Sequence, residues 1–186
     1  MNAPVDVTDI CIHTARLILR AWREEDLHDF YEYASVEGVG EKAGWKHHQS
    51  VEESKKILGT FICNKKTFAL EWKDTGKVIG SVGLEPRHED SGIPDELHGR
   101  EIGYVLSKDY WGKGIMTEAV KAVINYCFEM WGFDYLTCGH FDHNDRSRRV
   151  VEKCGFRFLK NVITQTARGV DEPGKMYVLY NPNKER

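Results

Sequence analysis

Two glycines, Gly112 and Gly114, stand between a predicted strand over 99–107 and a predicted helix that begins at about Ile115. The first N–H groups of a helix have no partner inside the helix, and the helix dipole places positive charge at the same end. Such a turn binds anions, most often phosphate. The segment 111–117 therefore predicts a loop in which backbone N–H groups hold a phosphate.

Two common phosphate-binding motifs do not account for this loop. A dinucleotide-binding fingerprint needs a third glycine further on, but the helix continues through Thr117. A Walker loop needs Gly-Lys before Ser or Thr, and here Gly112-Lys113 is followed by Gly114. The loop resembles instead the acetyl-CoA pyrophosphate loop of the GCN5-related N-acetyltransferases, the GNAT family. Asp109 stands where the family pattern has Gln or Arg, which makes it a candidate cap for the helix.

A second segment, Asn144 to Phe156, resembles the Asn-x-x-Ser-x-x-Val-x-Glu-Lys-x-Gly-Phe pattern of the RimJ/RimL-type ribosomal-protein acetyltransferases within that family. The segments 14–20 and 44–54 also fit this branch, so the resemblance covers nearly the whole chain. It implies an acetyl-CoA-dependent N-acetyltransferase, an enzyme that transfers the acetyl group to a primary amine by direct attack.

The resemblance also implies a mixed α/β fold. Its central, mostly antiparallel sheet has about seven strands with flanking helices, and a splayed pair of parallel strands binds CoA. Apolar periodicity along the sequence agrees with such a fold. We expect strands over 16–22, 68–73, 78–85, 99–107, 135–141, 156–164 and 176–180, and helices over 24–36, 51–63, 115–131 and 145–154. Ser50 and Glu53 form a capping box at the start of the second helix.

Length and composition predict one domain over 1–186. A net charge of -3 without a basic stripe argues against direct binding of nucleic acid. Five scattered cysteines indicate reduced thiols, and no apolar run suits a signal sequence or a membrane span. We expect a soluble, cytoplasmic monomer or homodimer. His140 and Asp142 share one face of a strand but lack further ligands at useful spacing, so no metal is expected.

The resemblance assigns most of the CoA contacts to backbone groups. The strand segment Tyr104-Val105-Leu106 would present N–H groups to the acetyl carbonyl and to pantetheine. Asn144 would contact pantetheine, and is also a helix cap by propensity. The phosphate-loop residues are Trp111, Gly112, Lys113, Gly114, Ile115, Met116 and Thr117.

Glu101 begins the strand before the loop, where related enzymes carry a catalytic glutamate, and it is the candidate general base. His47, His48 and Glu85 compete for this role. Many family members protonate the leaving thiolate with a tyrosine, but this chain has Val151 at that position. Ser147 becomes the candidate acid, unless it only completes the helix cap.

The acceptor pocket is expected near Trp45, His47 and the loop 86–98. A protein N-terminus, such as that of a ribosomal protein, is the preferred acceptor, because RimJ/RimL-type enzymes acetylate such amines. An enzyme for an antibiotic, a polyamine or an amino acid would share every CoA feature, and a non-catalytic acyl-CoA-binding homologue is a second alternative. No covalent acyl intermediate on Cys138 or Cys154 is expected.

Overall fold

The fold is built on one eight-stranded sheet. In the computed structural model, which describes residues 1–88 and 91–184, the strands lie in the order β1-β2-β3-β4-β5-β6-β8-β7. Every neighbouring pair is antiparallel except β5 and β6. The strands are β1 (Cys11–His13), β2 (Leu17–Ala21), β3 (Thr67–Trp72), β4 (Val78–Glu85), β5 (Gly99–Leu106), β6 (Tyr135–Phe141), β7 (Arg157–Gln165) and β8 (Asp171–Tyr180).

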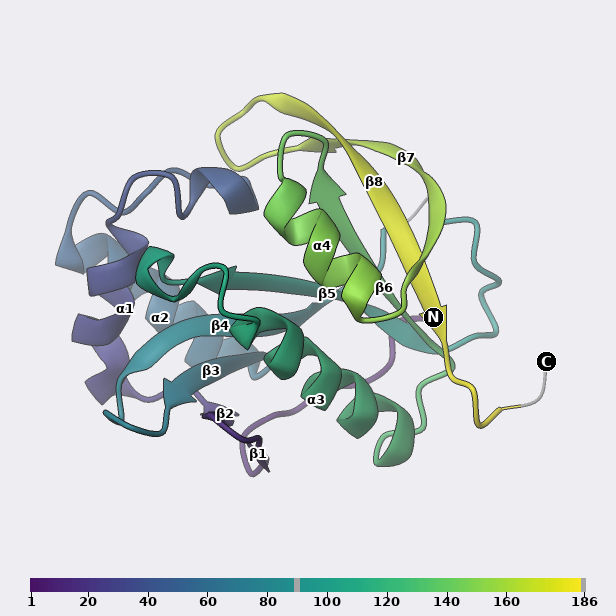
Figure 1. Ribbon diagram of the computed structural model, residues 1–186, viewed down its shortest axis with the longest axis horizontal. Helices are drawn as coiled ribbons and strands as arrows, with labels where there is room; N and C mark the ends of the chain where they lie inside the picture. The colour runs from purple at the N-terminus through teal and green to yellow at the C-terminus, as the bar shows by residue number, and fades with distance from the viewer. Residues whose placement is uncertain (89–90, 185–186) are drawn as a thin grey trace.

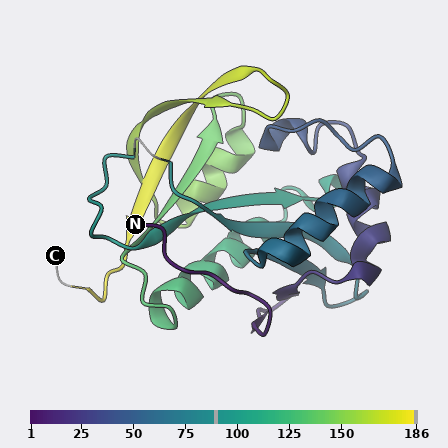
Figure 2. The same ribbon diagram turned by 180° about the vertical axis from the view of Figure 1, so that it is seen from behind.

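Helices cover both faces of the sheet. The α-helices are α1 (Leu27–Ala34), α2 (Val51–Asn64), α3 (Ile115–Glu129) and α4 (Asp145–Lys153), and short 3-10 turns are η1 (Glu24–Asp26), η2 (Glu41–Ala43) and η3 (Lys108–Tyr110). Figure 1 shows α3 and α4 in front of the sheet, and Figure 2 shows α2 in front when the molecule is seen from behind. One hydrophobic core lies under α3, and a second lies under α1 and α2.

The expected mixed α/β fold is confirmed, with two differences in its strands. The short strand β1 was not expected, and β8 begins at Asp171 where the sequence indicated Met176. The segment 171–175 has no apolar alternation, yet each of its residues pairs with β7. Cross-strand pairing, which no local pattern reports, therefore extends this strand. No helix in the described residues is long and apolar enough to span a membrane.

Helix α2 begins at the expected residue, but its cap differs in one bond. The Ser50 hydroxyl accepts a hydrogen bond from the Glu53 N–H at 3.2 Å. The Glu53 carboxylate, however, accepts from the Gln49 N–H at 2.7 Å, one residue before the position that a capping box uses.

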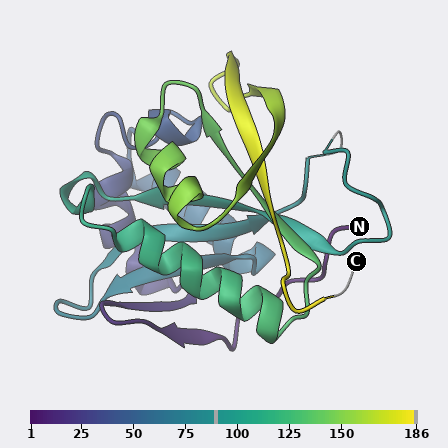
Figure 3. The same cartoon turned by 45° about the vertical axis from the view of Figure 1, so that its right-hand side comes forward.

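The central feature of the sheet is the end of pairing between its two parallel strands. β5 and β6 pair from Gly99 with Tyr135 to Ile102 with Cys138. Beyond this point β5 continues along β4 to Leu106, and β6 continues along β8 to Phe141. The two strands visibly run apart in Figures 1 and 3, and α4 lies across the opening. The expected splayed pair is therefore present.

The register assigns the side chains of β5 to opposite faces of the sheet, because successive residues of a strand alternate. Ile102 and Tyr104 belong to the core under α3, and Val105 packs with the core under α1 and α2. Glu101 and Gly103 share the face of Val105. The gap between β5 and β6 thus connects a face that carries Tyr104 with a face that carries Glu101.

One carboxylate ties the start of α3 to the N-terminal part of the chain. Glu118 accepts hydrogen bonds from the Thr14 hydroxyl at 2.6 Å and from the Arg16 N–H and Nε at 2.9 and 2.7 Å. Arg16 Nη1 also donates to the Lys113 carbonyl at 3.0 Å. Burial raises the pKa of Glu118, but these hydrogen bonds outweigh it and the pKa lies below its usual value.

We expect Glu118→Ala to lower the free energy of unfolding by about 1–3 kcal/mol, since it leaves several polar partners of a charged group unpaired. Urea denaturation at neutral pH measures this change. Glu129→Ala is the matched control, because Glu129 is an exposed glutamate of the same helix and its loss is expected to cost under about 0.5 kcal/mol. Equal stability of the two variants would contradict a role for Glu118 in holding α3 to the N-terminal part of the chain.

Candidate active site

A cleft of about 480 Å³ opens where β5 and β6 separate. Its volume lies in the range of sites for small molecules and cofactors. Residues of β5, the loop before α3, α3, β6 and α4 line it, together with Val39, Lys42 and Ala43 and residues of β7 and β8. Most of the residues expected from the sequence to contact CoA are among them: Tyr104, Val105, Leu106, Trp111, Gly112, Gly114, Ile115, Met116, Thr117, Asn144 and Ser147.

The loop before α3 has the geometry of an anion site. Gly112 and Gly114 adopt left-handed backbone conformations, with φ of 76° and 73°. Within the described residues, the N–H groups from Gly112 to Thr117 donate to no protein acceptor. Gly114 is the N-cap of α3 and has no side chain to occupy these donors. The loop therefore presents several free donors at the positive end of a helix.

Two charged residues of this loop lie differently from their expected places. Asp109 belongs to η3 and caps nothing at α3, whose N-cap is Gly114. Lys113 does not line the cleft. Its ammonium donates to the Asp109 carbonyl at 2.9 Å and lies 5.4 Å from the centre of the Tyr110 ring. Backbone donors, and not the Lys113 charge, face the cleft at this point.

Helix α4 brings a pair of hydroxyl groups to the cleft. Asn144 caps the helix, since its side-chain oxygen accepts from the Ser147 N–H at 3.2 Å, and its amide donates to the Lys42 carbonyl at 3.0 Å. The Ser147 hydroxyl lies 2.8 Å from the Tyr104 hydroxyl of β5. Burial raises the pKa of Tyr104 well above its usual value, so this phenol keeps its proton.

The same helix carries a row of cations. Arg146, Arg149 and Lys153 line the cleft, and the Arg146 guanidinium lies 4.8 Å from the centre of the Trp111 ring. No carboxylate of the described part of the chain pairs with these three side chains. Arg148, in contrast, is directed to the other side of the helix, where it meets Asp145 and Glu152. The cleft beside the glycine loop is consequently positive.

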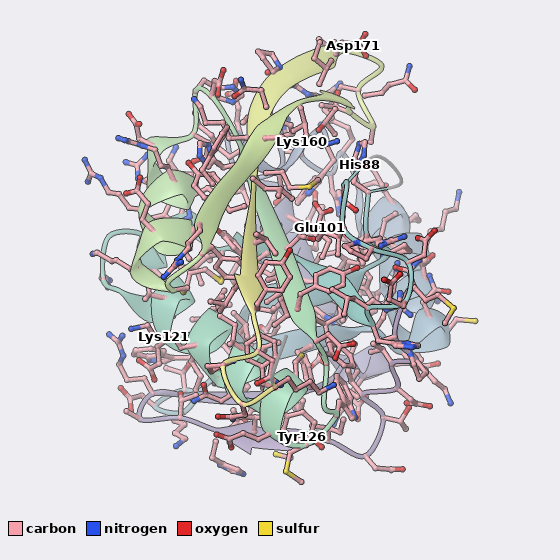
Figure 4. The ribbon with its side chains drawn as sticks, turned by 90° about the vertical axis from the view of Figure 1, so that its right-hand side faces the viewer. His88, Glu101, Lys121, Tyr126, Lys160 and Asp171 are labelled. Atoms are coloured by element: carbon pink, nitrogen blue, oxygen red, sulfur yellow. The ribbon has the colours of Figure 1, made fainter. Side chains whose placement is uncertain are left out.

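Glu101 lies on the opposite side of the gap. It is flanked in register by Glu85 of β4 and Thr137 of β6, so it is part of a central strand and not of a solvated strand end. Burial, and then the charge of Glu85, raise the pKa of Glu101 to about 7, and the His88 N–H partly opposes this rise. His88 lines the cleft from the loop beside it (Figure 4). A carboxyl group with this pKa can exchange a proton near neutral pH.

A glycine lies beside Glu101 on each splayed strand. A side chain at Gly103 would meet nothing within 4 Å, whereas one at Gly139 would come 3.3 Å from the Lys175 carbonyl oxygen and 3.9 Å from the Glu101 carboxylate. Both residues line the cleft. The space beside Gly103, on the face of Glu101, is therefore open to a second molecule.

Comparison with known proteins agrees with this geometry. The family model described as an acetyltransferase (GNAT) domain matches residues 16–157, which is most of the chain. The chain belongs to the GNAT acetyltransferase family. It is thus an N-acetyltransferase, and its splayed strands and glycine loop are those expected from the resemblance.

Relatives of this GNAT enzyme are found among bacterial proteins. The uncharacterized N-acetyltransferase YoaA of Bacillus subtilis is 26% identical over 151 residues, covering 78% of this chain and 82% of YoaA. A solved putative ribosomal-protein-serine acetyltransferase of Vibrio cholerae has the same fold, with a TM-score of 0.77, 19% identity, and coverage of 94% of this chain and 99% of that chain. The microcin C7 self-immunity acetyltransferase MccE, solved with acetyl-CoA and AMP, has a TM-score of 0.74 and 16% identity, and the alignment covers 90% and 93% of the two chains.

Two residues expected in the acceptor pocket of this GNAT enzyme do not line the cleft. The Trp45 ring contacts the His48 ring in a tilted arrangement, with 5.0 Å between the ring centres, and packs on the core under α1. The His47 ring lies 2.8 Å from the Glu41 carboxylate. Within the loop 86–98, residues 89–90 lie outside the described residues, and His88 is the residue that reaches the cleft.

Neither cysteine near the cleft has the character of a nucleophile. Burial raises the pKa of Cys138 far above its usual value and that of Cys154 to about 11. The reactive form of cysteine is the thiolate, so both side chains are inert at neutral pH. Among the residues with described positions, no group of three or more His, Cys, Asp or Glu side chains could hold a metal ion.

The sequence did not reveal three features of the site. The Tyr104 hydroxyl was overlooked because only the register shows that it meets Ser147. His88 stands in an irregular loop that offers no pattern. The row Arg146, Arg149 and Lys153 could have been found, because its spacing places the three side chains along one face of a helix.

The raised pKa of Glu101 makes a prediction for stability. Between the unfolded pKa near 4.3 and the folded value of about 7, the native state binds more protons than the unfolded state, so stability falls as pH rises through this window. Glu101→Gln removes this loss. We expect the variant to gain roughly 1–3 kcal/mol relative to the wild type between pH 4 and pH 8. Urea unfolding at a series of pH values measures the difference, and a gap that stays constant would show that Glu101 titrates normally.

Proposed function

We propose that this enzyme transfers the acetyl group of acetyl-CoA to the free α-amine of a peptide or protein N-terminus. The observation that carries the proposal is the charge of the cleft. Glu101 is the one carboxylate among its described lining residues, which include the cations Lys42, Arg146, Arg149 and Lys153. Polyamines and aminoglycosides carry several positive charges, and a single lining carboxylate offers them little electrostatic attraction.

The phosphate end of the cleft fits CoA. The free N–H groups from Gly112 to Thr117 would hold the pyrophosphate, and the cations of α4 would complement the remaining negative charge. Tyr104, Val105 and Leu106 would line the pantetheine arm on the inner edge of β5. Acetyl-CoA supplies the acetyl group as a reactive thioester.

The residues of the gap divide the remaining chemistry between the two faces of the sheet. When the amine forms the new C–N bond and the C–S bond breaks, Glu101 accepts the proton that the nitrogen loses. Backbone N–H groups of β5 stabilise the negative charge on the carbonyl oxygen. Ser147, held by the Tyr104 hydroxyl, donates a hydrogen bond to the sulfur on the opposite face. Tyr104 itself retains its proton because burial raises its pKa.

The electrostatics of Glu101 suit an α-amine better than a lysine side chain. Unperturbed pKa values are about 7.7–8.0 for an α-amine and about 10.4 for lysine, so at neutral pH the uncharged fraction of the α-amine is larger by more than about a hundredfold. A base with a pKa of about 7 is matched to the former. The resemblance to the RimJ/RimL branch and the fold shared with the Vibrio cholerae enzyme support a protein acceptor, including a ribosomal one.

The CoA site is tested at Gly112. We expect acetyl-CoA to raise the melting temperature of the wild type, since a ligand that binds only the native state stabilises it. Gly112→Asp is expected to abolish this shift, because its carboxylate faces the pyrophosphate. Gly112→Asn is the matched control, since both side chains tolerate the left-handed backbone but Asn is uncharged. The Asn variant should keep part of the shift in melting temperature. An unchanged shift in the Asp variant would show that this loop does not bind the pyrophosphate.

The acceptor is tested with two peptides of the same sequence. One has a free N-terminus and no lysine, and the other has a blocked N-terminus and one lysine. We expect kcat/KM for the first to exceed that for the second by at least about tenfold, following the difference in free-base fraction. Release of CoA measures both rates. Faster acetylation of the blocked peptide, or of an aminoglycoside or polyamine in parallel assays, would overturn the α-amine assignment.

A further inference from the structure

A second carboxylate lies beside Glu101 without entering the cleft. Glu85 of β4 is its direct partner in the antiparallel register, so both side chains project from the same face of the sheet. Like charges at directly opposed positions destabilise a sheet. The repulsion between Glu85 and Glu101 must be offset by another interaction, unless it serves the function of Glu101.

The compensation comes from Lys66. The Lys66 ammonium forms an ion pair with Glu85. The Lys66 backbone carbonyl accepts a hydrogen bond from the Leu84 N–H at 2.9 Å. The lysine is thus fixed beside the end of β4. Its charge reaches Glu85 but makes no ion pair with Glu101 within the described residues.

The two carboxylates differ in what they can touch. Glu101 lines the cleft, whereas Glu85 and Lys66 do not. A side chain at Gly83 would come 3.1 Å from the Glu85 carboxylate, which therefore lies back along its own strand. Glu85 and Lys66 can influence an acceptor amine only through the charge state of Glu101.

We propose that Glu85 and Lys66 are positioning residues that set the pH at which Glu101 becomes available as a base. The proposal rests on the proposed role of Glu101 in acetyl transfer. The Glu85 anion holds the proton on Glu101, because a nearby like charge disfavours a second carboxylate. The Lys66 cation limits this effect by neutralising part of the Glu85 charge. Opposite shifts are therefore expected when each partner is removed.

Other titratable or charged groups also lie around Glu101 and are left unchanged in the test. His88 follows β4, and its backbone N–H favours the charged carboxylate. Arg100 neighbours Glu101 on β5, where burial lowers its pKa and the charge of Glu85 partly opposes this. Further groups that line the cleft or pack beside it are Lys42, Tyr104, Cys138 and His140.

The test compares the wild type with Glu85→Gln, Lys66→Met and the double variant. The titration of Glu101 is followed in the ligand-free protein by carboxyl ¹³C NMR, and its signal is assigned by its absence in Glu101→Gln. We expect the midpoint to fall by on the order of one pH unit in Glu85→Gln and to rise in Lys66→Met. The double variant loses one charge of each sign and is expected to return close to the wild type.

The same variants are assayed for the pH dependence of kcat/KM with the free-amine peptide. The acidic limb is expected to move with the NMR midpoint, so that activity at pH 6 rises several-fold in Glu85→Gln and falls in Lys66→Met. Glu32→Gln and Lys77→Met are matched controls, because Glu32 and Lys77 form an exposed ion pair away from the cleft, with a distance of 2.8 Å. Neither control should move the Glu101 midpoint.

The two readouts separate the possible failures. An NMR midpoint that is the same in the wild type, Glu85→Gln and Lys66→Met overturns the tuning role of this pair, whatever the activity. An NMR midpoint that shifts as expected while the acidic limb stays in place supports the tuning and rejects Glu101 as the base. If Lys66→Met does not fold, Lys66→Gln takes its place. A general loss of packing around Glu101 would lower the midpoint, as Glu85→Gln does, so a rise on loss of the Lys66 charge is the result that distinguishes charge tuning from loosened packing.

Discussion

The architecture depends on one constraint, which is that two parallel strands stop pairing while each remains paired on its outer edge. β5 keeps its hydrogen bonds to β4 and β6 keeps its hydrogen bonds to β8, so the sheet stays intact while its centre opens. Unpaired backbone groups inside a protein are costly. A ligand that offers matching donors and acceptors removes this cost, so the opening favours an extended polar chain such as pantetheine. Helix α4 is fixed across the opening by two residues. Val151 is buried in the core, and the Ser147 hydroxyl forms a hydrogen bond with the Tyr104 hydroxyl.

The alternation of side chains along β5 then separates the two halves of the chemistry. Tyr104 faces α3 and α4, together with the glycine loop and the cations of α4. Glu101 faces the other side of the sheet, where Gly103 leaves space. The proposed CoA site and the proposed base can meet only inside the gap. In the proposed mechanism the acceptor approaches from the face opposite to the cofactor, which suits direct transfer between two molecules bound at once.

The features that the sequence predicted are those that local residues determine. Helix α3, its glycine loop and the cap of α4 follow from spacing, propensity and helix-end chemistry within a few residues. The features that it missed depend on register between distant segments: Tyr104 with Ser147, Glu85 with Glu101, and the pairing that extends β8 to Asp171. Lys113 shows a third case. The residue type suited a phosphate, but the turn directs its side chain to the Asp109 carbonyl.

Burial and the neighbouring Glu85 charge affect Glu101 in two ways: they lower the stability of the folded protein and they raise the basicity of the carboxylate. Burial and the Glu85 charge disfavour its ionised form, so the folded protein loses stability as the carboxyl group is forced to ionise. The same two effects bring its pKa to about 7, where a carboxylate that has given up its proton binds another one readily. An exposed glutamate with a pKa near 4.3 would be ionised but a much weaker base. A shallow cleft could not provide this shift, because water would restore the ordinary pKa. The burial of Glu101 between the splayed strands therefore contributes to its basicity, at the place where the proposed cofactor site begins.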